Sequence, residues 1–188
     1  MRLRSSRPLR PLPLAEGHVA PNARLFWSRE AYLDTLPKSG VWTEVGVLRG
    51  DFASEILERT KPTKLHLIDK QLSRWDVRNR FAAHSIVECH EGHSADILAT
   101  FPDAYFDCVY IDAGHRYPNV RADASVAARK TKPAGIIIFN DYVIWSHIEG
   151  YEYGIVPTVN EMCVNEGWQI VAFCLHSEMY CDVALRRR

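Results

Sequence analysis

Neither sign of charge predominates in this 188-residue sequence, because Lys plus Arg number 23 and Asp plus Glu also number 23. Without a net field, the chain is not expected to bind nucleic acid or an anionic membrane surface. No apolar run approaches the roughly 18 to 20 residues that span a bilayer, and the first residues lack the apolar segment of a secretory signal. We therefore expect a soluble protein with a small-molecule partner.

The sequence also lacks any C-x-x-C pair, any Cys or His cluster typical of zinc, and any internal repeat. Its cysteines are odd in number and mostly lie in apolar runs, which is typical of buried free thiols in a reducing compartment. These features predict a cytoplasmic protein without disulfides. The five cysteines are Cys89, Cys108, Cys163, Cys174 and Cys181.

Residues 1–23 contain four arginines and four prolines, with Glu16 as their first acidic residue. This composition predicts a flexible arm. Two other roles stay open for it: an anion-binding or docking tail, and a segment that completes a lid or a homodimer contact. We expect organised structure from Arg24 onward, beginning with a helix over 24–36 and forming a single domain over 24–188.

Beyond this point, short β-rich runs alternate with helix-like segments, which predicts an α/β fold with a doubly wound, mostly parallel sheet. The connection around His176 is too short for a parallel crossover, so the last two strands should be antiparallel. The expected strands are 41–45, 64–69, 86–90, 106–112, 135–140, 168–174 and 179–186. The expected helices are 52–59, 72–83, 95–101, 118–131 and 158–166.

The stretch TEVGVLRG, residues 43–50, follows the first of these strands and contains Glu44, Gly46 and Gly50. In a doubly wound sheet, this loop lies at the ligand crevice, where glycine lets a ligand approach the backbone. The stretch fits neither the dinucleotide fingerprint nor the P-loop. A carboxylate at Glu44 would repel phosphate and attract a cation. The loop thus favours a positively charged ligand, with an ordinary strand-to-helix turn as the alternative.

Asp69 in LHLID ends the next strand about 20 positions beyond the glycine loop, where an acidic residue can bind both hydroxyls of a ribose. In ECHEGHSADIL, the residues from Gly92 to Ala95 follow a strand and suit the edge of an adenine. Ser94 has an equal alternative as a helix N-cap. These three features together favour S-adenosylmethionine, which is a cationic nucleoside with an amino-acid tail.

Five segments together resemble the class I S-adenosylmethionine-dependent methyltransferases: TEVGVLRGDFASEIL, LHLIDK, FDCVYIDAGHRY, KPAGIIIFNDY and DVALRR. The nearest resemblance is to the small bacterial branch of metal-dependent O-methyltransferases that act on sugars and other hydroxylated metabolites. It implies a seven-stranded Rossmann-like sheet with an antiparallel last strand. It also implies that the cofactor contacts are Glu44, Gly46, Val47 and Gly50 at the methionine end, Asp69 at the ribose, Gly92, His93 and Ser94 at the adenine, and Asp112.

Asp112 and the pair Asn140-Asp141 follow two strands that should be neighbours, so their side chains should meet at one edge of the sheet. Their oxygen donors suit a hard cation such as Mg²⁺, and the resemblance to metal-dependent O-methyltransferases points the same way. Relatives often carry Asp-Asp or Asp-Asn where this chain has Asn140-Asp141. The alternative is a hydrogen-bonded polar cluster that supports the cofactor.

Methyl transfer to oxygen requires an acceptor held in line and a group that removes its proton. His115, three residues beyond Asp112, is the predicted base because an imidazole titrates near neutral pH. A structural histidine bonded to a backbone carbonyl is the alternative. The other histidines show no such convergence, including His18, His66, His84 and His90.

The segment YVIWSHIEGYEYGIVP is expected to select the acceptor through its aromatic residues, although such rings equally suit an interface or a packed loop. They are Trp145, His147, Tyr151 and Tyr153. The predicted function is O-methylation of a sugar or phenol with S-adenosylmethionine and, in one version, Mg²⁺. A catalytically silent cofactor-binding module and an NAD-dependent oxidoreductase are the alternatives.

Overall fold

The computed structural model describes residues 10–188, so the part of the predicted arm that covers residues 1–9 lies outside the described residues. The strands are β1 (Val19–Phe26), β2 (Val41–Val45), β3 (Lys64–Asp69), β4 (Val87–Glu91), β5 (Phe106–Ile111), β6 (Thr131–Phe139), β7 (Trp145–Ser146), β8 (Tyr151–Glu152), β9 (Trp168–Cys174) and β10 (Asp182–Arg187). The helices are the 3₁₀ turn η1 (Glu16–His18), α1 (Arg29–Thr35), α2 (Asp51–Thr60), α3 (Val77–Arg80), α4 (Ser94–Ala99), α5 (Tyr117–Lys130) and α6 (Ile155–Asn165).

Eight strands form the main sheet in the order β1-β9-β10-β6-β5-β2-β3-β4. All neighbouring pairs are parallel except those of β10, which runs antiparallel to both β6 and β9. The predicted doubly wound α/β fold with an antiparallel last strand is therefore confirmed. β1 adds an eighth strand to the seven that were expected.

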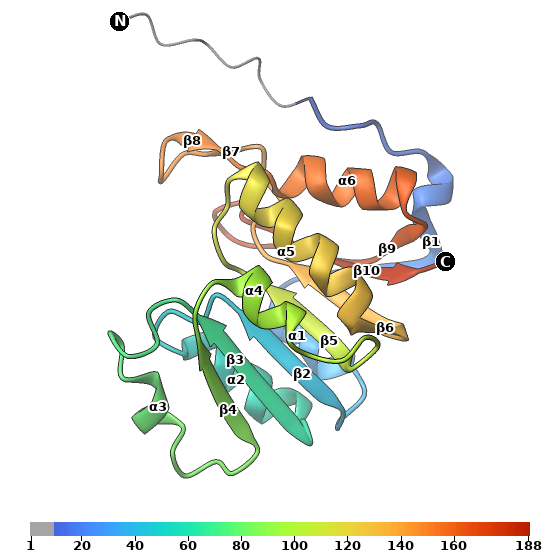
Figure 1. Cartoon of the computed structure of the whole chain (residues 1–188). Coiled ribbons are helices and arrows are strands. Elements are labelled where there is room, and N and C mark those ends of the chain that lie inside the picture. Colours follow the sequence, from blue (N-terminus) through green and yellow to red (C-terminus); the bar gives the residue numbers. More distant parts are fainter. Residues whose placement is uncertain (1–9) are drawn as a thin grey trace, which may run out of the picture.

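Helices cover both faces of the sheet and enclose two apolar layers (Figure 1). α4, α5 and α6 lie on one face, over a core that includes Phe106, Ile137 and Trp168, whereas α1 and α2 pack on the other against Trp42 and Leu67. Strands buried on both faces read as continuous apolar runs, and this is why β5 and β6 were located from the sequence.

The chain order of the strands reverses between β2 and β5, which lie side by side at the centre of the sheet. In open α/β sheets, the loops that leave such a pair separate toward opposite faces and open a crevice at the carboxyl ends of the strands. The fold thus positions the loop after Val45 and the loop after Ile111 at one crevice.

The start of the chain departs from the prediction. Residues 24–26 were expected in a helix but belong to β1, which begins at Val19, before the predicted domain boundary at Arg24. Leu25 is exposed and Phe26 is buried, so these neighbours alternate as a strand does. As an edge strand, β1 also tolerates Pro21, whose missing N–H would disrupt a central strand.

Two other boundaries also differ from the prediction. The expected helix over 72–83 is reduced to α3, a single turn flanked by other turns, and β10 begins at Asp182 instead of residue 179. All five cysteines are free, and four of them are buried, as predicted. Over residues 10–188, the helices are all too short or too polar to span a membrane.

Candidate active site

A cavity of about 920 Å³ opens at the carboxyl ends of β2, β3, β4 and β5, around the point where the strand order reverses. Its size suits a nucleoside-containing ligand, since small-molecule pockets are typically about 300 to 1,000 Å³. The predicted cofactor residues that line it are Glu44, Gly46, Val47, Asp69, Gly92, His93, Ser94 and Asp112. The structure therefore contains a cavity where the sequence predicted a ligand crevice.

Glu44 lies in β2, faces this cavity, and is only 1% exposed. Its Oε2 atom is buried and finds no hydrogen-bond partner among residues 10–188. Burial, followed by the charge of Asp112, raises the pKa of this carboxyl well above its ordinary value, while Arg29 opposes the shift. A buried carboxylate without a partner is costly, so this oxygen is suited to a ligand that brings a donor or a positive charge.

The turn after β2 depends on Gly46. Its φ of 92° is in the left-handed region, and a Cβ at this position would lie 2.0 Å from the carbonyl oxygen of Asp112. The close approach is fixed by a hydrogen bond from the Asp112 N–H to the Val45 carbonyl, 2.7 Å. Glycine at residue 46 is thus required for the two central loops to meet.

Gly50, the second glycine of the motif, does not line the cavity. It is the N-cap of α2, with φ 83°, and a Cβ there would lie 2.7 Å from the Phe81 ring. The described contacts of Gly50 are therefore those of a helix start packed against α3. Its predicted contact with the cofactor stays a prediction.

The carboxylate of Asp69 organises the same loop. Oδ2 accepts hydrogen bonds from the N–H groups of Val47 and Leu48 at 2.9 and 3.0 Å, and Oδ1 accepts one from Gln71 at 2.8 Å. A carboxylate has about four acceptor positions, so one is left that can face the cavity. Asp69 therefore joins the ends of β2 and β3 and keeps capacity for a ligand hydroxyl.

The predicted adenine edge follows β4. Gly92, His93 and Ser94 all line the cavity, but the N-cap of α4 is His93, so Ser94 is the first helical residue and not the cap that was considered for it. Asp123 of α5 lies beside Ser94 and is 2% exposed. Burial raises the pKa of Asp123 to about 6, partly offset by the Ser94 side chain.

Asp112 and His115 line this cavity and Asp141 lies beside them, each offering a ligand atom within 4.8 Å of the others. His115 Nε2 lies 3.5 Å from Asp112 Oδ1 and 3.6 Å from Asp141 Oδ2. Its Nδ1 lies 3.5 Å from Glu149 Oε2, and its ring stacks on Tyr153 with the centroids 4.4 Å apart. An Nδ1–H directed at Glu149 would leave the Nε2 lone pair directed at the two aspartates.

The carboxylates around His115 determine the electrostatics of this cluster. Burial opposes protonation of His115, but Asp112, Asp141 and Glu149 outweigh it and raise its pKa. Burial, and then the proximity of Asp112, raises the pKa of Asp141 to about 6. Two partly buried carboxylates this close together are suited to a shared cation.

Asn140, which was predicted beside Asp112 and Asp141 as a metal ligand, has a different set of contacts. Its Nδ2 donates to Asp182 Oδ1 at 3.0 Å and to the Tyr110 hydroxyl at 3.2 Å. Arg29 donates to the same hydroxyl at 3.0 Å. The Asn140 amide nitrogen is therefore turned into a buried polar network, whereas a cation would bind the Oδ1 atom, which these bonds do not use. The predicted role of Asn140 as a metal ligand stays a prediction, and the nitrogen donor beside the two aspartates is His115.

A second cavity of about 340 Å³ adjoins the first, with Arg29 and Glu149 lining both. It contains Asn140, Asp141 and Tyr153, together with residues of the loop that precedes β10. Of the four aromatic residues expected to select the acceptor, Tyr153 lines this cavity and Tyr151 lines the larger one. Trp145 and His147 line neither cavity, and Trp145 is 57% exposed.

The mostly parallel sheet with an antiparallel β10, and a nucleoside-sized cavity at its switch point, define the fold of class I S-adenosylmethionine-dependent methyltransferases. The sequence profile of a family described as a methyltransferase domain matches residues 43–142, more than half of the chain. The protein belongs to this family. The matched range contains every predicted site residue from Glu44 to Asp141.

Solved structures show the same fold at low sequence identity. The O-methyltransferase TomG of Streptomyces achromogenes, involved in tomaymycin synthesis and solved in complex with S-adenosylmethionine, has a TM-score of 0.62 and 18% identity, over 78% of this chain and 72% of its own. The 1,6-didemethyltoxoflavin-N1-methyltransferase of Burkholderia thailandensis, solved with 1,6-didemethyltoxoflavin and S-adenosylhomocysteine, has a TM-score of 0.57 and 16% identity, over 80% and 72%.

An O-methyltransferase family protein, also from Burkholderia thailandensis, has a TM-score of 0.62 and 16% identity, over 84% of this chain and 55% of its own. The chain thus spans little more than half the length of that protein, and 59% of another matched methyltransferase. Curated protein sequences gave no match. Since all three described structures are less than 25% identical to this chain, they support the fold and not a particular acceptor.

Three site residues were missed by the sequence interpretation. Arg29 is the first residue of α1, whose N-cap Ser28 accepts a hydrogen bond from the Ala31 N–H at 3.2 Å. Asp123 and Glu149 reach the cavities from α5 and from the turn between β7 and β8. A motif at the end of a strand predicts only the site residues of the loop that follows that strand. These three residues come from other elements and reach the cavities through tertiary packing.

Proposed function

We propose that this protein binds S-adenosylmethionine in the larger cavity and transfers its methyl group to an oxygen of a small hydroxylated metabolite, with assistance from a divalent cation. The observation that carries this proposal is the buried Glu44 oxygen without a partner, at the switch point of a methyltransferase fold. S-adenosylmethionine carries an ammonium group, which can donate a hydrogen bond to the Glu44 carboxylate, and a sulfonium group, which adds a second positive charge.

Several residues would hold the cofactor. Glu44 would face the positively charged amino-acid end, beside the backbone of Gly46 and Val47. Asp69 would accept a hydrogen bond from a ribose hydroxyl through its remaining acceptor position. The adenine would lie against Gly92, His93 and Ser94, with Asp123 behind them.

We place the acceptor in the smaller cavity, next to Asp141 and Tyr153. Its walls carry charged and hydroxyl groups, including Arg29, Glu149 and Tyr180. Such groups can bind several hydroxyls at once, and Ile148, Tyr153 and Tyr180 add apolar surface on which a ring can pack. This lining therefore suits both predicted acceptor classes, a sugar and a phenol.

His115 would remove the acceptor proton through Nε2. Glu149 faces its Nδ1 and Tyr153 packs against its ring, so the ring is held in one orientation. Glu149 would stabilise the protonated imidazole, as a carboxylate partner does in other histidine bases. Asp112, the other residue predicted to be catalytic, would position His115 from the opposite side, where its Oδ1 lies 3.5 Å from Nε2.

The residues at this point also fit a divalent cation, which would be held by the carboxylates of Asp112 and Asp141 and by the Oδ1 atom of Asn140. A bound cation supplies Lewis-acid stabilisation of a deprotonated acceptor oxygen. These oxygen donors suit Mg²⁺ or Mn²⁺. His115 would stay outside this ligand set, because Nε2 cannot both bind a cation and accept a proton.

The test is methyl transfer from labelled S-adenosylmethionine to a panel of sugars, polyols and phenols. His115→Ala should lower turnover by roughly 10²- to 10⁴-fold, while the affinity for S-adenosylhomocysteine stays near that of the wild type. The control is His84→Ala, since His84 is exposed and lines neither cavity. Wild-type turnover in His115→Ala would reduce His115 to a structural residue.

A further inference from the structure

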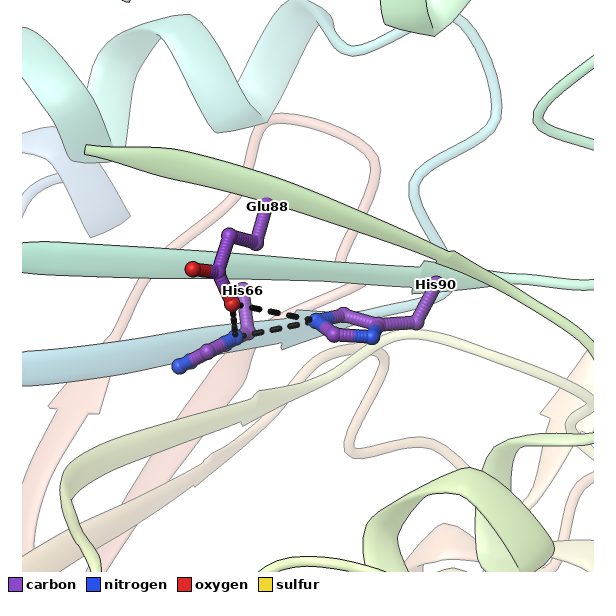
Figure 2. Close-up of side chains that lie close together, drawn as sticks. All are labelled: His66, Glu88 and His90. Carbon is purple, nitrogen blue, oxygen red and sulfur yellow. Dashed lines mark hydrogen bonds and ion pairs between the residues drawn. The ribbon is translucent and has the colours of Figure 1, made fainter. Parts of the chain in front are cut away.

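A second group of metal-ligating side chains lies on β3 and the edge strand β4. Figure 2 shows His66, Glu88 and His90 directed toward one another on one face of these strands. None of the three lines either cavity. The sequence interpretation found no convergence of His66 and His90, and the structure corrects this.

The pairing register of the strands explains the convergence. His66 of β3 is directly opposite Glu88 of β4, and Ile68 is opposite His90. Glu88 and His90 are two residues apart on one strand, so both point to the same face as their partner His66. Because register is a property of the folded sheet, the motifs LHL and ECH do not reveal it separately.

The spacing of the three ligand atoms matches a tetrahedral zinc site. His66 Nδ1 lies 2.9 Å from His90 Nε2 and 3.4 Å from Glu88 Oε2, and the latter two atoms are 4.0 Å apart. In tetrahedral zinc sites with bonds of about 2.0 to 2.1 Å, neighbouring ligand atoms are about 3.3 Å apart. The observed separations lie on both sides of this value, so small side-chain shifts would place all three atoms around one ion.

The surroundings of His66 orient its ring for binding. The Tyr105 hydroxyl lies 3.2 Å from Nε2 and can accept the Nε2–H, which leaves the Nδ1 lone pair directed at the other two ligands. The rings of Phe101 and Phe106 pack edge-on against the imidazole.

The opposite side of the group is open to solvent. His66 is 3% exposed, whereas the side chains of His90 and Glu88 are 28% and 46% exposed. Lys64 forms an ion pair with Glu88 Oε1 and so leaves Oε2 turned toward the histidines. Three protein ligands and one solvent-facing position are the usual composition of an open zinc site.

We propose that His66, Glu88 and His90 form a second cation site, separate from the active site, that takes Zn²⁺ or a similar borderline transition-metal ion. Two imidazole nitrogens select such an ion over Mg²⁺ or Ca²⁺, which prefer oxygen ligands. The ion would link the edge strand β4 to β3 close to the ends of the two strands. At those ends, Asp69 and Gly92 line the larger cavity. Because the ion would bind the folded chain and not the unfolded one, it should also stabilise this end of the sheet.

The experiment is calorimetric titration of Zn²⁺ into the chelator-stripped full chain carrying His115→Ala, which weakens the cluster at the active-site mouth. One Zn²⁺ should bind per chain. Adding His90→Ala should weaken it by at least about 100-fold, and Tyr105→Phe by about 10- to 100-fold, the usual cost of losing an outer partner of a ligand. Adding His84→Ala instead should leave the affinity unchanged, because His84 is an exposed histidine shortly before β4 and outside the group.

Circular dichroism would verify that each variant is folded, and Glu88→Gln provides a second ligand variant because its side chain is half-exposed. Zn²⁺ should raise the Tm of the His115→Ala protein and not that of the protein that also carries His90→Ala. Absence of saturable binding would overturn the proposal and leave an ordinary hydrogen bond between the two imidazoles. Equal affinities in the His90→Ala and His84→Ala proteins would overturn it as well. Neither result depends on methyl transfer.

Discussion

At the scale of single residues, Glu44 links the stability of this protein to its proposed function. Its Oε2 atom is buried without a partner in the part of the chain that the structure describes, and burial opposes its ionisation. Such a group destabilises the free protein and is useful only when a ligand completes its contacts. The side chain is thus expected to be unfavourable for folding and favourable for binding.

Replacing Glu44 with Gln should separate these two effects. Gln keeps the shape and removes the buried charge, so we expect the Tm of the free protein to rise by about 2 to 8 °C. The affinity for S-adenosylhomocysteine should fall by about 10- to 100-fold, because a charge-assisted contact is lost. Differential scanning fluorimetry and calorimetry measure the two quantities, and a fall in both would mean that Glu44 is a structural residue.

Asp123 gives a prediction for pH. Its folded-state pKa of about 6 lies above the ordinary value of 3.8 because the side chain is buried. Between about pH 4 and pH 6 the folded protein therefore binds more protons at Asp123 than the unfolded chain does, so its contribution to stability decreases as pH rises through this window. The full effect is at most about 3 kcal/mol.

Asp123→Asn should remove this dependence. The free energy of unfolding of the wild type, minus that of the variant, should fall by about 1 to 3 kcal/mol between pH 4 and pH 7. Urea unfolding at a series of pH values measures the difference and cancels the contributions of other groups. Parallel curves for the two proteins would contradict the assigned pKa.

The site residues that could be predicted from the sequence are those next to a clearly patterned strand. Glu44, Asp69 and Asp112 are at or next to the ends of strands whose apolar patterns were clear, so their positions followed from the fold class. Arg29 and Glu149 reach the cavities from a helix and a turn that are far from these strands in sequence. No local pattern marks such residues, because what places them is packing between elements.

At the scale of elements, the loop between β2 and α2 is the part of the site with the least freedom. Gly46 adopts a left-handed conformation, and its Cα faces the backbone of the loop after β5. The Asp69 carboxylate fixes the next two N–H groups. A change in this loop should therefore affect both the stability of the sheet and the cavity.

Gly46→Ala should destabilise the protein by several kcal/mol, since its methyl group would lie 2.0 Å from the Asp112 carbonyl oxygen. Gly150→Ala is the matched control, because Gly150 has φ 73° and open space around it. The control should show the backbone strain alone, about 1 kcal/mol. Urea unfolding compares the two variants, and equal losses would show that the clash at residue 46 is relieved by movement of the loop.

The elements that were predicted wrongly have physical explanations. β1 was missed at the start of the chain because it is an edge strand with Pro21 inside it, and because its partner β9 is about 150 residues away in sequence. The helix expected over 72–83 has Asp76 in a left-handed conformation immediately before α3, which prevents the helix from including residues 72–76. In both cases a tertiary or backbone requirement overrode the local apolar pattern.

At the scale of the whole molecule, the site is assembled from both halves of the sheet. β2, β3 and β4 end at the larger cavity, in which we propose that the cofactor binds, whereas Asp141 after β6 and the loop before β10 line the smaller cavity proposed for the acceptor. The carboxylates of Asp112 and Asp141 meet at the boundary, around His115. A cation at this boundary would act on the reaction and not on the cofactor.

Removal of divalent cations should therefore abolish most methyl transfer and leave cofactor binding intact. We expect EDTA to lower turnover, Mg²⁺ or Mn²⁺ to restore it, and Asp141→Ala to prevent the restoration. Methyl transfer in EDTA with each ion added back measures this, and S-adenosylhomocysteine affinity under the same conditions is the control. Full activity in EDTA would leave proton removal to His115 alone.

The central claim, that the larger cavity binds S-adenosylmethionine, is tested most directly by calorimetric titration of S-adenosylhomocysteine into the wild type. We expect saturable binding of one molecule per chain. Asp69→Ala should weaken it by about 1 to 3 kcal/mol, and the surface control Asp34→Ala should not change it, since Asp34 is exposed and pairs with Arg59 outside the cavity. No saturable binding of S-adenosylhomocysteine, or saturable binding of NAD in its place, would contradict the account.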